Sequence, residues 1–81
     1  MARYTVLLYP EEGGYSALVP VLGVASQGDT IEEAIDMAKE AAELHIQGLV
    51  EDDEPVLVEE EAPIVAGFEV KLPRLAGAAT A

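Results

Sequence analysis

The stretch Ser26-Gln27-Gly28-Asp29-Thr30-Ile31-Glu32-Glu33-Ala34 decides the fold, because here an extended chain turns into a long helix. Thr30 and Glu33 have the spacing of a capping box, in which the hydroxyl accepts from the Glu33 amide and the carboxylate reaches back to the Thr30 amide. Asp29 and Glu32 offer the same geometry one residue earlier, which leaves the register open. We therefore predict a helix that begins at about residue 30.

The helical pattern continues to about residue 50. At 100° per residue, one broad face collects the apolar side chains and the single histidine: Ile31, Ala34, Ile35, Ala38, Ala41, Ala42, His45, Ile46 and Leu49. The alanines at the centre of this face predict close packing against a sheet. Glu51-Asp52-Asp53-Glu54-Pro55 predicts the end of the helix, because negative charge opposes the helix dipole there and the residue before a proline is extended.

Four segments have the β-branched, aromatic and apolar composition of strands, namely residues 4–9, 15–19, 24–26 and 64–72. The first is expected to direct Tyr4, Val6 and Leu8 to one face. Pro10-Glu11-Glu12-Gly13-Gly14 predicts a hairpin turn. The order β-β-β-α-β predicts an α+β fold, a two-layer sandwich with one long helix on one face of an antiparallel sheet.

In the last segment the side chains alternate between two faces. Phe68, Val70 and Leu72 share one face, and the charged Glu69 and Lys71 share the other. This alternation predicts a strand with one buried side.

Length and charge are those of one small acidic domain. We expect the domain over residues 1–72 and a flexible C-terminal tail over residues 73–81. Such a short chain buries only roughly 60% of its unfolded surface, so self-association would help its core. Sixteen acidic residues against four basic ones give a net charge of −12. That charge argues against direct nucleic-acid binding and suits a basic protein partner, or simply a solubilising surface.

The residues do not assemble into an enzyme or a cofactor site. His45 lies in the apolar stripe and is expected to be packed or at an interface, and neither serine has a nucleophile motif around it. The acidic runs 51–54 and 59–61 lack the ligand spacing of a calcium loop. We predict no catalysis, cofactor or metal. The sequence contains no cysteine, and no signal peptide or membrane-length apolar run is recognisable, so a cytoplasmic protein is expected.

Two motifs together carry a family resemblance: Gly13-Gly14-Tyr15 and the Ser26–Ala34 stretch. They stand in the order of a pattern with a Y-x-V strand, a P-D/E-x-G-G-Y turn, a strand ending in proline and a T/S-Q-G-D-T-x-E-E-A helix start. With Tyr4, Val6, Pro10 and Pro20 in place, the chain from Tyr4 to Pro55 resembles the HicB-like family of bacterial antitoxins. It departs from the pattern at residues 20–24, a loop one residue shorter, without the usual second proline and cysteine.

The resemblance implies a three-stranded sheet, one helix and a further strand, in a protein that forms dimers or larger assemblies. It also implies an antitoxin that is not an enzyme and that occupies the active surface of a small basic, RNA-cleaving toxin of the HicA type. Full antitoxins of the family often carry a C-terminal DNA-binding domain. Nine residues follow Leu72, so we expect no such domain here.

Site residues follow from exposure and charge. For the toxin contact we predict the acids at the hairpin tip and past the helix: Glu11, Glu12, Asp52, Asp53 and Glu54. For self-association as a dimer or tetramer we predict the edge strands of the sheet together with Met37 and Leu44, which flank the apolar stripe. The alternative function is an orphan self-assembling α/β module that binds a small ligand or another protein.

Overall fold

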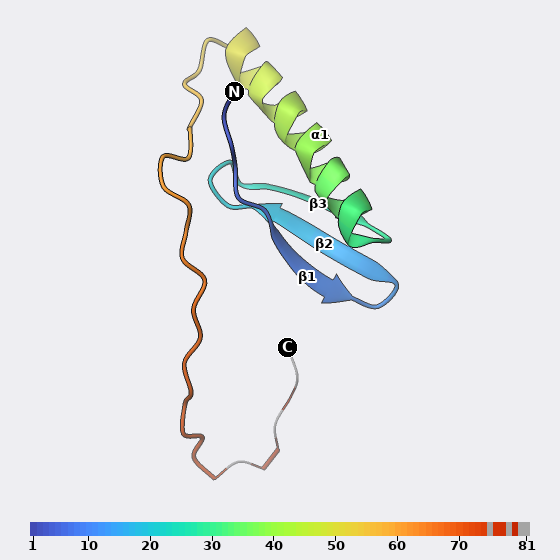
Figure 1. Cartoon of the computed structure of the whole chain (residues 1–81), viewed down its shortest axis with the longest axis vertical. Helices are drawn as coiled ribbons and strands as arrows, with labels where there is room; N and C mark the ends of the chain where they lie inside the picture. Colours follow the sequence, from blue (N-terminus) through green and yellow to red (C-terminus); the bar gives the residue numbers. More distant parts are fainter. Residues whose placement is uncertain (75, 78, 80–81) are drawn as a thin grey trace.

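The chain forms a three-stranded antiparallel sheet with one long helix on one face (Figure 1). The computed structural model describes residues 1–74, 76–77 and 79. The elements are β1 (Leu7–Glu11), β2 (Gly14–Val19), β3 (Val24–Gly28) and α1 (Ile31–Glu51). The sheet order is β1-β2-β3, so both turns connect neighbouring strands. The predicted α+β arrangement is confirmed.

The strand boundaries differ from the prediction mainly at β1. This strand begins at Leu7 rather than at residue 4 and continues through Pro10 to Glu11. Proline is tolerated there because β1 is an edge strand, whose outer amides need no partner within the sheet. Gly13 has a φ of 81° in the hairpin, the left-handed region that glycine enters without strain.

The core lies between α1 and the sheet and is built from small side chains. Ala17 and Val19 of β2 meet Ala34 and Ala38 of α1. Tyr4, Val6 and Leu8 pack against this cluster, as the predicted strand face required. Because alanine side chains are small, the helix approaches the sheet closely. Only a narrow line of alanines on α1 is buried.

The helix is longer than the sheet beneath it. Its 21 residues span about 30 Å, whereas the six residues of β2 span about 20 Å. The last turns of α1 therefore extend past the strands (Figure 1). His45 lies on this overhang and is exposed, so the expectation that it packs inside is wrong for the single chain. Ile31 and Ile35 are also partly exposed, because the helix buries only its alanine line.

After α1 the chain runs back along the N-terminal segment and then away from the fold (Figure 1). The Tyr4 hydroxyl donates to the Leu57 carbonyl at 2.7 Å. The Thr5 amide and hydroxyl donate to the two Glu59 carboxylate oxygens at 3.1 and 2.7 Å. Residues 64–72, predicted as a strand, are extended and unpaired in this structure. Part of the predicted tail, residues 75, 78, 80 and 81, lies outside the described residues.

Candidate functional site

An acidic hollow of about 400 Å³ lies between the β1–β2 hairpin tip and the start of α1. Two of the predicted toxin-contact residues, Glu11 and Glu12, line it. Asp29 and Glu33 bring two further carboxyl groups, and Met37 supplies an exposed apolar side chain from the second turn of α1. The hollow thus combines negative charge with a small apolar contact, a composition that suits a basic protein surface.

Strand register brings the hairpin tip to the helix start. Glu11 pairs with Gly14, and Tyr15 pairs with Gly28 at the end of β3. Gly28 makes the approach of β3 to α1 possible, because a Cβ there would lie 2.5 Å from the Ala34 nitrogen and 2.8 Å from the Glu33 carbonyl carbon. Any other residue at position 28 must move the first turn of the helix, and with it the wall of the hollow.

The helix cap fixes two of the acidic residues. The Thr30 hydroxyl accepts from the Glu33 amide at 3.1 Å, as predicted. The Glu33 carboxylate accepts from the Asp29 amide at 3.1 Å, one residue before the partner that a capping box predicts. Glu33 is therefore held on the wall of the hollow by its capping role. The sequence predicts only a capping role for Asp29 and Glu33, because only the fold brings them into the same hollow as Glu11.

The other predicted acids lie at the far end of α1. Asp53 takes a left-handed conformation with a φ of 55°. Its amide donates to the Val50 carbonyl at 3.1 Å, and the Glu54 amide donates to the Leu49 carbonyl at 2.8 Å, the two bonds of a Schellman C-cap. Asp52, Asp53 and Glu54 are exposed there. The length of α1 separates them from the hollow by about 30 Å, so the five predicted acids form two patches rather than one.

The two predicted self-association residues lie on the outer surface of α1. Met37 is 42% exposed and Leu44 is 62% exposed. They are seven residues apart, so they share one helix face at a separation of about 10 Å. Six acidic residues and one lysine make up the charged side chains of α1. Both apolar side chains therefore stand on a strongly negative helix surface.

A second, apolar hollow of about 430 Å³ opens between α1 and the N-terminal part of the chain. Tyr4 and Val6 line it from the N-terminal segment, and Ile35 and Ile46 line it from α1. It exists because α1 packs mainly on β3 and β2 and leaves the β1 side of the sheet uncovered. We call this hollow the α1–β1 groove.

The described part of the chain has neither a metal-binding cluster nor a membrane-spanning helix. There, no three His, Asp or Glu side chains gather in a way that would hold a metal ion. Nor does any described helix combine the length and the apolar composition needed to cross a bilayer.

A family model described as the HicB_like antitoxin of bacterial toxin–antitoxin systems matches residues 4–66. The match covers the sheet, α1 and the start of the segment that follows. The chain belongs to this antitoxin family. The acidic hollow lies wholly within the matched residues, and the α1–β1 groove does so except for Met1 and Ala2, so both belong largely to the HicB-like domain.

Three relatives are similar to much of this chain. A UPF0150 protein of Synechocystis is 54% identical over 56 residues, which cover 67% of this chain and 71% of that protein. A UPF0150 protein of Helicobacter pylori is 41% identical over 61 residues, or 74% of this chain and 83% of the relative. An uncharacterized 14.9 kDa protein of Haemophilus phage HP1 is 46% identical over 52 residues, 63% of this chain, but only 39% of the phage protein is matched. No solved structure matches the chain.

Proposed function

We propose that this HicB-like chain neutralises a small, basic, RNA-cleaving toxin of the HicA type by covering its surface, without catalysis of its own. The observation that carries the proposal is the family match over residues 4–66. The net charge of −12 supports it, because a strongly negative protein attracts a basic partner over distance and speeds the encounter. The complex would form in the cytoplasm.

The acidic hollow is the surface that we assign to the toxin. Glu11 and Glu12 are exposed at the hairpin tip, and Asp29 and Glu33 line the same hollow from the start of α1. Carboxylates gathered in a concave site act together on one cationic side chain, which isolated surface charges do not. Asp52, Asp53 and Glu54 remain part of the proposal as a second patch at the other end of α1, suited to a partner that spans the helix.

We further propose that the chain self-associates as a dimer or tetramer. Met37 and Leu44 are the contact residues that we expect on α1, since both are exposed apolar side chains on an otherwise charged helix. Met37 also lines the acidic hollow. An assembly through Met37 would therefore lie beside the surface that we assign to the toxin.

The experiment begins with capture of the partner. The tagged protein is used to recover binding proteins from its host at low salt, and each small basic protein recovered is tested for RNA cleavage with and without this chain. We expect one such protein, released by moderate salt because the contact is largely ionic, with its cleavage suppressed by this chain. Recovery of no protein whose RNA cleavage this chain suppresses would refute the proposal and favour the orphan module.

A charge-matched pair of variants then locates the contact. Glu11→Lys with Glu12→Lys reverses two charges in the acidic hollow. Glu60→Lys with Glu61→Lys makes the same change in net charge on an exposed segment outside both patches. We expect the first pair to weaken toxin binding at least 10-fold and to flatten its salt dependence, and the second pair to do much less. Equal effects of the two pairs would remove the hollow from the interface.

A further inference from the structure

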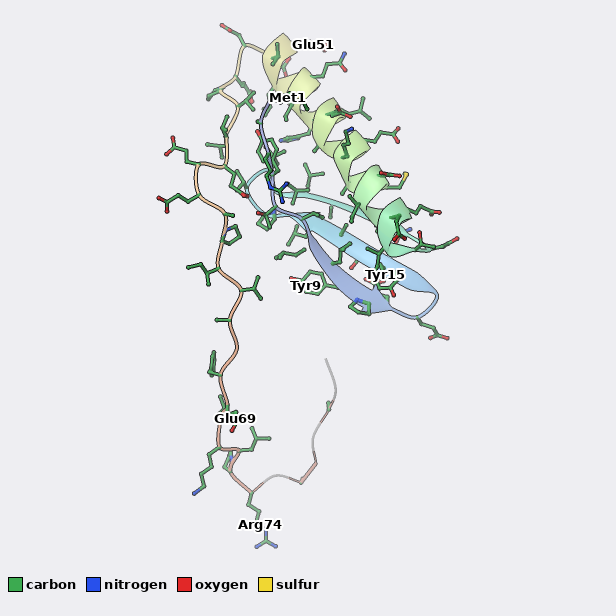
Figure 2. All side chains as sticks on the ribbon, viewed as in Figure 1. Met1, Tyr9, Tyr15, Glu51, Glu69 and Arg74 are labelled. Atoms are coloured by element: carbon green, nitrogen blue, oxygen red, sulfur yellow. The ribbon has the colours of Figure 1, made fainter. Side chains whose placement is uncertain are left out.

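The segment from residue 64 to residue 72 has a two-sided pattern that the single chain leaves unused. Ile64, Ala66, Phe68, Val70 and Leu72 alternate with Val65, Gly67, Glu69 and Lys71, so one face is wholly apolar. Ile64 is 93% exposed and Phe68 is 89% exposed. Figure 2 shows Glu69 and Arg74 far from both the sheet and α1. These nine extended residues have the alternating pattern of a β-strand but belong to no sheet in the described structure.

The contacts at the start of this segment set an alignment in which most of it extends beyond the end of its own β1. Tyr4 contacts Leu57 and Thr5 contacts Glu59, so the segment enters beside the start of the sheet in the direction of β1. Counting on from the Thr5–Glu59 pair, Glu11 at the end of β1 falls opposite Val65. Phe68, Val70 and Leu72 then lie beyond the last residue of the strand. In this register, the part with the strongest alternation has no residue of its own β1 opposite it.

An acceptor for such a strand is present on the surface of the same fold. β1 is an edge of the sheet, so within the described residues its outer amide and carbonyl groups have no neighbouring strand. The α1–β1 groove opens where the chain enters this strand: Val6, the residue before β1, and Ile35 of α1 line it with apolar side chains. A strand added to β1 would place its apolar face in this groove and its charged face toward solvent.

The size of the exposed surface also calls for a partner. The accessible surface is 7010 Å², against roughly 4,700 Å² expected for a compact chain of this length. The radius of gyration is 16.5 Å, against roughly 12 Å. If each chain of a pair buried half of its accessible surface in excess of the compact value, the interface would bury roughly 2,300 Å² in total. This is the size of an obligate homodimer interface.

We propose that residues 64–72 form the fourth strand of a second copy's sheet, added at the β1 edge with Phe68, Val70 and Leu72 in the α1–β1 groove. Exchange of these segments between two copies would supply hydrogen-bond partners to the β1 edge of each copy and would bury the apolar face of each segment. We assign the groove to a second copy because each chain carries one such segment and one such groove. A two-fold symmetric pair of chains therefore fills both grooves. The assembly does not depend on the proposed toxin and is tested without it.

The test uses engineered cysteines, which are unambiguous because the chain contains none. A Val70→Cys chain and an affinity-tagged Ile35→Cys chain are mixed in denaturant, refolded together and oxidised mildly. We expect a disulfide between the two different chains in high yield. Lys71→Cys in place of Val70→Cys is the control, because residue 71 points to the opposite face; its yield should be several-fold lower.

Two further measurements test whether the segment pairs with a second copy. A single chain that carries both Val70→Cys and Ile35→Cys would give a monomeric internal disulfide if the segment folded back on itself, and that result would overturn the proposal. Sedimentation at about 100 μM should give a dimer, and Phe68→Asp should weaken it roughly 10- to 100-fold, as loss of one buried aromatic predicts. A wild-type chain that stays monomeric would overturn it too, and would leave residues 64–72 to a different protein such as the toxin.

Discussion

Gly28 is the position where one added carbon should do the most damage, because β3 and α1 nearly touch there. In Gly28→Ala, the new Cβ would lie 2.5 Å from the Ala34 nitrogen, 2.8 Å from the Glu33 carbonyl carbon and 2.9 Å from the Ala34 Cα. All three are backbone atoms of the first helical turn, and Ala34 is fully buried. The clash cannot be relieved by a side chain, so the helix must move away from the sheet.

Overpacking of this kind costs about 1 to 3 kcal/mol, and the rigid backbone at this site favours the upper half of that range. A loss of about 2 to 3 kcal/mol corresponds to a fall in Tm of roughly 10 to 20 °C in a domain of this size. Urea unfolding followed by circular dichroism, at matched protein concentration, measures the loss directly.

Gly48→Ala is the matched control for this substitution. A Cβ at Gly48 meets no atom within 4 Å, and the residue is inside α1. Alanine there should therefore raise stability by about 0.5 to 1 kcal/mol, since it lowers the backbone entropy of the unfolded chain. Opposite signs for the two variants are the expected result. A Gly28→Ala protein as stable as the wild type would refute the close packing of β3 on α1.

Three further substitutions test the ends of the helix and the segment after it. Asp53→Gly should stabilise the protein by about 1 kcal/mol in urea unfolding, because it relieves a left-handed conformation and removes a negative charge from the helix C-terminus. The control Asp52→Gly changes a residue with a φ of −88° and should give no such gain in stability. Equal gains from the two substitutions would contradict the C-cap assignment. Thr30→Ala should lower the free energy of unfolding by about 1 kcal/mol, with Thr30→Ser close to the wild type. Glu59→Ala removes the two carboxylate oxygens that accept from the Thr5 amide and hydroxyl. Proteolysis after residue 54 and hydrogen exchange at the Thr5 amide should therefore both become faster. Unchanged exchange at the Thr5 amide would argue against this contact.

Much of the fold follows from local chemistry in the sequence. The helix was expected from about residue 30 to 50 and runs from Ile31 to Glu51, because its cap residues and its acidic, proline-bounded end act within a few residues. The hairpin is equally local, since Gly13 supplies the left-handed turn residue. Such features need no knowledge of distant contacts.

Features that depend on how elements meet were not predictable in the same way. His45 has the helical angle of a packed residue but is exposed, because α1 outruns a sheet whose strand lengths the sequence fixes only approximately. Asp29 and Glu33 join Glu11 in one hollow only through the pairing of β2 with β3. Residues 64–72 have the alternation of a strand, yet they pair with no strand among the described residues, and sequence pattern alone does not reveal a pairing partner.

The central claim, that this chain is an antitoxin which acts by covering a basic toxin, is tested most directly by titration. The captured toxin is held at a fixed concentration with a labelled RNA, and this chain is added in increasing amounts while cleavage is measured. We predict that cleavage falls to background near a fixed stoichiometry, and that the Glu11→Lys, Glu12→Lys variant needs at least 10-fold more protein to reach the same inhibition. Cleavage that continues unchanged at saturating wild-type protein would contradict the account.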